Sequence, residues 1–333
     1  MTQDALYISR SGAETLIPTE VSNEIIQNLP GSSAALKLFR RLPNMSAKQQ
    51  TLPIAATLPN AYFLNGDTAQ KKTSNAEWSK LTLTAEEIAV IIPIPEAVID
   101  DASYDIWAAL KPQIAEAFGV AIDAAVFFGT NKPTSFPTAI VTAALAAGNY
   151  VAAGTNSDIA EDIIGENGLM AKVEECGYKV TGFYADSSLE AKFRSLRDNN
   201  GQLIYMPSLT SAAPNTLVGR PLTYDEVGGI FDTSTALMVA GDFSKAVYSI
   251  RQDLTYKVLD QAIIQNTDGT IAYNLAQQDM VALRCVMRLG VQVANPVNRR
   301  NKQSKYPFAI LTPEVESTTT TTTTTTTETE TTP

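Results

Sequence analysis

The sequence contains no histidine, and this absence excludes several classes of enzyme. Histidine is the usual general base at neutral pH and a common zinc ligand, so Ser-His-Asp systems, Cys-His systems and HExxH zinc sites are all excluded. A serine nucleophile with a lysine base would need an S-x-x-K spacing, which does not occur. The glycine-rich patterns that bind dinucleotides or nucleotide phosphates are missing too.

Long apolar runs and cysteine pairs are also lacking. No stretch approaches the roughly 20 apolar residues of a membrane-spanning helix, and the N-terminus lacks the basic and then apolar pattern of a signal peptide. The two cysteines, Cys176 and Cys285, stand alone. We expect both to be small core residues of a protein that folds in a reducing cytosol. The formal net charge of −10 disfavours a nucleic-acid-binding protein, which needs a basic surface.

The most regular feature that is present is an amphipathic segment near residue 110. Its apolar residues recur every three or four positions, which predicts a helix over residues 105–128, about 36 Å long. Pro112 predicts a kink or a late helix start, and Gly129 and Pro133 predict the end of the helix. The predicted polar face carries Asp101, Lys111, Glu116 and Asp123.

The region before this helix is predicted to project from the core. Residues 1–50 indicate an arm with short helices at 20–29 and 33–42, lying either on the chain's own domain or on a neighbouring subunit. Residues 51–92 indicate one long hairpin with a polar tip between its strands. A two-stranded projection is marginally stable alone, so the hairpin favours an oligomer.

The region after the helix alternates short strands and helices, which predicts a compact α/β domain. A single helix is expected over residues 157–176, and two long strands are expected within residues 280–293. The chain ends in ten successive threonines and Thr-Glu repeats, which predict a disordered tail. That tail could serve as a linker, a display segment or a glycosylation substrate.

Several short strings, in their order along residues 17–296, resemble segments of the major capsid proteins of tailed bacteriophages. No single string is specific, but their order is. The strings are Leu52-Pro53-Ile54, Trp78 with Leu81 and Leu83, Glu87-Ile88-Ala89, Ile94-Pro95-Glu96, Phe127 through Pro133, Asp198 through Gln202, Leu217 through Leu222, Ala240-Gly241-Asp242-Phe243, and Gln278 through Arg284.

The resemblance implies an α+β chain with the HK-ninety-seven-like capsid fold. That fold has an N-terminal arm, an extended hairpin loop, a peripheral domain with a long spine helix, and an axial α/β domain. The implied division is an arm at 1–50, the hairpin loop at 51–92, the peripheral domain with its spine helix at 93–156, the axial domain at 157–272, returning strands of the peripheral domain at 273–312, and a Thr-rich tail at 313–333.

The resemblance also implies a function. Subunits of this family assemble into pentamers and hexamers of an icosahedral phage head that encloses double-stranded DNA, here without specific binding. The expected role is structural, with no catalytic residue, cofactor or metal, and the expected location is the virion after assembly in the bacterial cytoplasm. The expected partners are other copies of the chain, a separate scaffolding protein, a portal and a decoration protein. The candidate inter-subunit contacts are Lys37, Arg40, Arg41, Asp67, Lys71, Lys72 and Trp78.

Three alternatives stay open at this stage. An encapsulin, a bacterial compartment with the same fold, would hold cargo proteins instead of DNA. Some capsid proteins crosslink a hairpin-tip lysine to an asparagine, but a partner for Lys71 or Lys72 is not evident, and solvated lysines are the more common case. An enzyme built on the α/β domain would rely on Asp186, Asp198 and Asp242, with Mg²⁺ as a candidate ligand.

Overall fold

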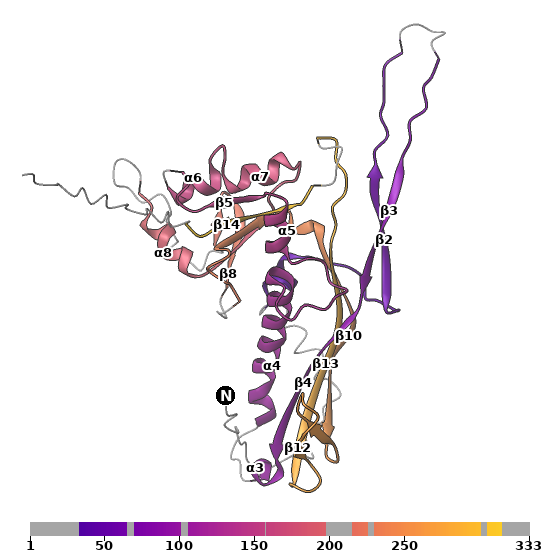
Figure 1. Ribbon diagram of the computed structural model, residues 1–333, viewed down its shortest axis with the longest axis vertical. Coiled ribbons are helices and arrows are strands. Elements are labelled where there is room, and N and C mark those ends of the chain that lie inside the picture. The colour runs from indigo at the N-terminus through magenta and orange to yellow at the C-terminus, as the bar shows by residue number, and fades with distance from the viewer. Residues whose placement is uncertain are drawn as a thin grey trace, which may run out of the picture.

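A computed structural model describes residues 33–64, 70–100, 106–156, 158–197, 215–225, 230–300 and 305–314, with the backbone alone at 106–109. Figure 1 shows a long central helix between two sheets, and a hairpin that projects beyond the rest of the molecule. The expected helix at 20–29, the strand expected near residue 205, Asp67, Asp198 and the threonine run lie outside the described residues.

The long helix α4 spans Ile106–Asp123 and continues as a π-helical turn, η1, over Ala124–Phe128. Pro112 lies inside α4, and a separate short helix, α3, covers Glu96–Asp100. Gly129 ends the helix with a φ of 80°, a left-handed conformation that glycine adopts without steric cost. The predicted helix and its end are therefore confirmed.

A four-stranded sheet with the order β1-β10-β13-β4 packs against α4. Its strands are β1 (Arg40–Arg41), β4 (Glu86–Pro95), β10 (Ala246–Leu259) and β13 (Met280–Val293). Alternate residues of β4 (Ile88, Val90 and Ile92) and buried residues of β13 contact the same apolar cluster as Ile114, Phe118 and Ile122 of α4. The apolar face of α4 and the apolar faces of the strands, which the helical and the period-two patterns define, thus pack together in one core.

The hairpin consists of β2 (Gln49–Thr57) and β3 (Glu77–Thr84), which pair antiparallel from Gln49 opposite Thr84 to Thr57 opposite Glu77. The prediction of one hairpin extending to residue 92 is wrong. The chain leaves the hairpin at Ala85, which is buried, and β4 then pairs with β13 over its whole length. The apolar residues of β4 have a better partner in that sheet, because one face of β4 is covered there by the core around α4.

A six-stranded mixed sheet forms the second layer, with the order β5-β14-β9-β6-β8-β7. Helices α6 and α7 lie over one side of it (Figure 1). Its strands are β5 (Tyr150–Ala152), β6 (Gly182–Ala185), β7 (Thr216–Leu217), β8 (Arg220–Tyr224), β9 (Met238–Gly241) and β14 (Phe308–Thr312). The remaining elements are α2 (Ala34–Leu38), α5 (Ile140–Ala146), α6 (Ile159–Ile164), α7 (Leu169–Glu175), α8 (Ser188–Ser195), η2 (Phe243–Lys245), β11 (Ile263–Gln265) and β12 (Ile271–Asn274).

Two details of this region differ from prediction. The single helix expected over residues 157–176 is divided into α6 and α7. Gly165 caps the end of α6, and Gly168 caps the start of α7. The two strands expected within 280–293 form one continuous strand, β13. Both cysteines are buried as predicted, Cys176 at the end of α7 and Cys285 in β13.

The chain crosses between the two sheets at positions that differ from the predicted division. Strand β10, which lies within the predicted axial domain at 157–272, pairs with β13 in the four-stranded sheet. Strand β14, which lies within the predicted returning strands at 273–312, pairs with β5 and β9 in the six-stranded sheet. The physical reason is that backbone hydrogen bonds can join strands that lie far apart in sequence, so a strand need not belong to the same sheet as its neighbours in the chain.

Gly241 illustrates how closely β9 and β14 approach one another. A Cβ atom at this position would lie 2.3 Å from Cδ1 of Phe308 and 2.6 Å from the carbonyl oxygen of Pro307. Gly241→Ala is therefore expected to lower the free energy of unfolding by about 1–3 kcal/mol, as overpacking does in other cores. Urea denaturation would measure this. Gly182→Ala on β6 is the matched control, because the atom nearest to its new Cβ lies 3.4 Å away, which is an ordinary van der Waals contact. Equal loss in both variants would refute the packing argument.

Candidate inter-subunit surfaces

The outer half of the hairpin exposes large apolar side chains. Phe63 is 102% exposed, Trp78 is 72% exposed on β3, and Tyr62 and Leu64 are each 41% exposed. The inner half of the hairpin is different, because Leu52 and Leu81 pack against a small buried cluster that contains Leu42, Met45 and Leu83. The hairpin is thus anchored at its base and leaves aromatic side chains uncovered further out, which is typical of an interaction surface.

Two lysines accompany these aromatic residues. Lys71 and Lys72 are exposed, and within the described part of the chain neither forms an ion pair. The Tyr62 hydroxyl donates to the carbonyl oxygen of Lys72 at 2.7 Å, and the Lys72 backbone N–H points at the same hydroxyl oxygen. This contact across the hairpin places the lysines beside the exposed apolar residues. Trp78 lies further down, opposite Ala55.

The other predicted contact residues lie in a separate place. Lys37 is exposed on α2, and Arg40 and Arg41 form the exposed strand β1 beside Val247 and Tyr248 of β10. Residues 34–36 of the same segment are buried in the core of their own subunit. Of the two alternatives for residues 33–42, the structure supports a segment packed on its own domain, with its basic residues on the outer surface.

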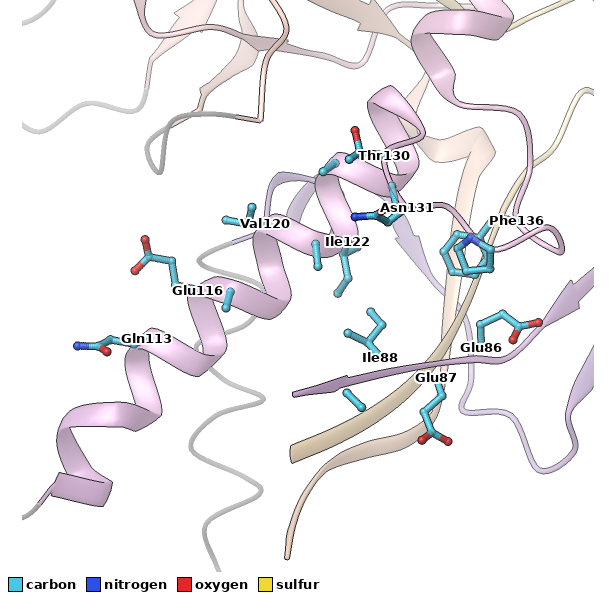
Figure 2. A pocket seen from close by; sticks show the side chains of 16 residues that line it. Glu86, Glu87, Ile88, Gln113, Glu116, Val120, Ile122, Thr130, Asn131 and Phe136 are labelled. Atoms are coloured by element: carbon cyan, nitrogen blue, oxygen red, sulfur yellow. The ribbon is translucent and has the colours of Figure 1, made fainter. Parts of the chain in front are cut away.

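A groove lies between α4 and β4, with a volume of about 880 Å³. Figure 2 shows Ile88 and Ile122 pointing into the space between helix and strand, with the carboxylates Glu86, Glu87 and Glu116 at its margins. The wall contributed by α4 also includes the exposed alanines Ala117 and Ala121. Sequence reasoning missed this groove, because small residues on a helix look the same whether they face a neighbouring element or open space.

The charges at the groove margin are only partly neutralised within the subunit. Glu87 lies 3.7 Å from Arg288 of the adjacent strand β13, and both side chains are partly exposed. Glu86 accepts a hydrogen bond from the Ser135 hydroxyl at 2.7 Å. Within the described residues Glu116 has no ion-pair partner. The groove therefore combines an apolar floor with an acidic margin.

Two of the three aspartates of the enzyme alternative, Asp186 and Asp242, have structural roles. Asp186 accepts hydrogen bonds from the backbone and hydroxyl of Ser188 at the start of α8, and Asp242 accepts from Ser244 at the start of η2. Over the described ranges, no group of three metal-ligating side chains is close enough to hold a metal ion. In the same ranges, no helix has the length and hydropathy to cross a membrane.

Asp162 and Asp123 are both buried, and for Asp123 this differs from prediction. Asp162 is fully buried and accepts hydrogen bonds from the backbone N–H groups of Gly154 and Asn156, each at 2.8 Å. Asp123, predicted on the polar face of the long helix, is 1% exposed. The prediction that Asp123 is exposed to solvent is wrong, because a buried carboxylate is stable where several N–H and O–H groups donate to it.

The sequence and the fold match those of phage proteins. The phage capsid family model matches residues 13–298. The major capsid protein of Staphylococcus phage 80alpha is 26% identical over 286 residues, which cover 83% of this chain and 81% of that protein. A solved structure from Microbacterium phage Oxtober96 is 35% identical with a TM-score of 0.73, and the match covers 85% of this chain and 91% of that chain.

A second solved structure, from Mycobacterium phage Cain, is 30% identical with a TM-score of 0.73, and the match covers 92% of this chain and 96% of that chain. The α+β fold described above is therefore the fold of phage capsid structures. The resemblance identified from the sequence is confirmed, and so is the prediction of a structural protein. The chain belongs to the phage capsid family.

Proposed function

We propose that this chain is a major capsid protein whose copies form pentamers and hexamers of an icosahedral phage head around double-stranded DNA. The observation that carries the proposal is the family match over residues 13–298. The exposed hairpin supports it, because Phe63 and Trp78 remain uncovered within one subunit and need a neighbour. Repeated contacts of this heterologous kind close into rings and shells when the rotation between copies closes. The chain is then a component of the virion.

The parts of the fold take their roles from this arrangement. Helix α4 and the sheet β1-β10-β13-β4 form the peripheral domain with its spine helix, and the six-stranded sheet with α5 to α8 forms the axial domain. The hairpin β2-β3 is the extended loop. The arm predicted at residues 1–50 lies mostly outside the described residues. In this assignment β10 and β14 each belong to the domain of their sheet and not to the domain of their sequence neighbours.

The outer hairpin fits the groove of a neighbouring copy. Its exposed aromatic residues match the apolar floor formed by Ile88 and the alanines of α4, and its lysines match the acidic margin. Opposite charges across an interface favour the correct register and raise the association rate. We assign Lys71, Lys72 and Trp78 to this contact. Lys37, Arg40 and Arg41 are assigned to a second contact, because they form a separate exposed basic group.

The enclosed DNA is held without sequence-specific recognition. The net charge of −10 limits phosphate neutralisation, which supplies most of the affinity of non-specific DNA binding. A separate scaffolding protein, a portal and a decoration protein complete the set of proposed partners. The encapsulin alternative rests on the shared fold alone, whereas the matched relative is named as a phage capsid protein.

Electron microscopy and sedimentation of the full-length protein expressed alone test the proposal. Closed shells, or rings of five and six subunits, are the expected result. If only monomers are present, co-expression with candidate scaffolding and portal proteins encoded beside the gene is the second measurement. A protein that stays monomeric under both conditions would contradict the proposed function.

A further inference from the structure

Strand β4 lies at the edge of its sheet, and its register with β13 is unbroken. The Glu96 N–H, just after β4, donates to the carbonyl oxygen of Asp279 on the β13 side at 2.8 Å. On β13, the Val286 carbonyl oxygen accepts from the Thr255 hydroxyl of β10 at 3.2 Å and so points away from β4. Successive residues of a strand direct their N–H and C=O groups to opposite sides. Both contacts therefore indicate that the odd-numbered residues from 87 to 95 direct theirs away from β13.

Two of these five outward positions are closed to a further strand, and three are open. Pro93 and Pro95 lack an N–H, and proline in a sheet is confined to positions where no ladder bond is lost. Glu87, Ala89 and Ile91 each keep one outward donor and one outward acceptor. Within the described residues, no backbone hydrogen bond uses these outward groups. The first half of β4 is thus an edge to which another strand can be added.

This open edge lies in the groove between α4 and β4. Glu87 and Ala89 line one wall of the groove. The exposed alanines Ala117 and Ala121 of α4 line the other wall, and Figure 2 shows Ile88 pointing into the space between helix and strand. A strand added to β4 would lie about 4.8 Å from it. The alanines leave room for such a strand, because their side chains end at Cβ.

The outer hairpin has backbone groups that lack a partner in the same way. Its two arms continue beyond the β2–β3 ladder (Figure 1), but over the described residues no backbone-to-backbone hydrogen bond joins residues 58–64 to residues 70–76. The first arm ends in three exposed large apolar residues, Tyr62, Phe63 and Leu64. The second arm is polar from Gln70 to Asn75. The first arm is therefore the one whose side chains suit an apolar groove.

We propose, on the basis of the proposed function, that residues 60–64 of one copy add to β4 of a second copy as an extra strand. The outward groups of Glu87, Ala89 and Ile91 pair with alternate residues of the added strand. Phe63, which is 102% exposed in the subunit, packs on the alanine wall of α4. Backbone pairing supplies affinity in such a contact, and the side chains supply specificity.

The added strand comes from a second copy and not from the chain's own hairpin. Leu52 and Leu81 hold the base of the hairpin against the subunit, and its outer part projects beyond the rest of the molecule (Figure 1). Charge favours the same pairing between copies, because Lys71 and Lys72 on the second arm meet the acidic margin of the groove. Beyond Ile91 the two prolines end the pairing, which fixes where the added strand stops.

Ala89→Pro tests the strand addition in the full-length protein. The substitution removes an outward N–H and leaves the β4–β13 ladder complete, as Pro93 and Pro95 do further along β4. The yield of shells is expected to fall about tenfold or more, because every copy of the contact loses a hydrogen bond and leaves a carbonyl oxygen unpaired. Ala89→Ser is the matched control, since it keeps the N–H and a small side chain, and it is expected to give the wild-type yield. Circular dichroism would verify that both variants fold.

Hydrogen–deuterium exchange at single-residue resolution is a second measurement and needs no variant. When wild-type subunits assemble, the amide of Ala89 is expected to exchange about tenfold more slowly. The amides of Ile88 and Val90 are expected to change little, because they already bond to β13 in the subunit.

Two results would overturn the strand addition while leaving the proposed function intact. One is a wild-type yield of shells from folded Ala89→Pro. The other is an Ala89 amide that exchanges as fast in wild-type shells as in free subunits, and this result counts even if the proline variant fails to fold. A wild-type protein that forms no shells, alone or with its scaffolding and portal proteins, would instead contradict the proposed function and the strand addition together.

Discussion

Replacing Lys71 and Lys72 together by glutamate is expected to abolish the formation of closed shells while leaving the subunit folded. Both side chains are exposed on the hairpin, so neither contributes to the core. In the assembled state the change would place two negative charges against the acidic margin of Glu86, Glu87 and Glu116, and juxtaposed like charges cost several kcal/mol at an interface. Sedimentation velocity and electron microscopy would measure the loss of shells, and circular dichroism would verify the fold.

A charge exchange on the groove side provides the decisive control. Glu116→Lys alone is expected to weaken assembly, and combined with Lys72→Glu it is expected to restore part of the shell yield, because opposite charges again face one another. A second pair of variants tests the apolar floor. Ala121→Arg inserts a long side chain into the groove, whereas Ala191→Arg adds the same side chain to an exposed position of α8, outside the groove. Normal shells from Ala121→Arg would show that the hairpin does not occupy the groove.

Phe127→Ala is expected to lower the free energy of unfolding by about 3–5 kcal/mol. Phe127 is fully buried in the π-helical turn η1, and its ring centroid lies 5.7 Å from that of Phe39 and 4.6 Å from that of Tyr184. Phe39 precedes the long helix in sequence and Tyr184 follows it. Removing the Phe127 ring would leave a cavity between these two side chains. Chemical denaturation with two independent probes would measure the effect.

Phe63→Ala is the matched control for this prediction, because it removes the same side chain from a fully exposed position. Its free energy of unfolding is expected to change by less than about 0.5 kcal/mol, as is usual for surface positions. In an assembly assay below the unfolding temperature of Phe127→Ala, the order should be reversed. Phe63→Ala is then expected to reduce shell formation more than Phe127→Ala does. Equal stability losses in the two variants would contradict the assignment of Phe127 to the core and Phe63 to the interaction surface.

Hydrophobic periodicity predicted the local elements well and the environment of single polar residues poorly. The helical period placed Asp123 on the polar face of α4, where an aspartate normally meets water. The structure buries it, because the Ser33 hydroxyl and two backbone N–H groups from a segment far away in sequence satisfy its oxygens. A periodic pattern counts polar residues as solvated, and it contains no information about a donor that folds over them from elsewhere.

The hairpin shows the corresponding limit for strands. The alternation of residues 81–84 and the apolar run after Ala85 look like one continuous strand, and the sequence alone favoured a single hairpin. The structure pairs β3 with β2 but pairs β4 with β13, whose partner residues begin near position 280. Pairing through backbone hydrogen bonds uses groups that every residue carries, so the pattern of a strand identifies its faces but not its partner.

The sequence by itself determined the class of protein. The absence of histidine, the ordered strings of capsid-like residues, the amphipathic helix ended by Gly129 and the polar-tipped hairpin are all local features, and local features can be read from the chain. Only the tertiary structure decided that β10 and β14 belong to sheets other than those of their neighbours, that α4 and β4 enclose a groove, and that Asp123 holds Ser33. Each of these depends on contacts between residues far apart in sequence, which side-chain periodicity does not specify.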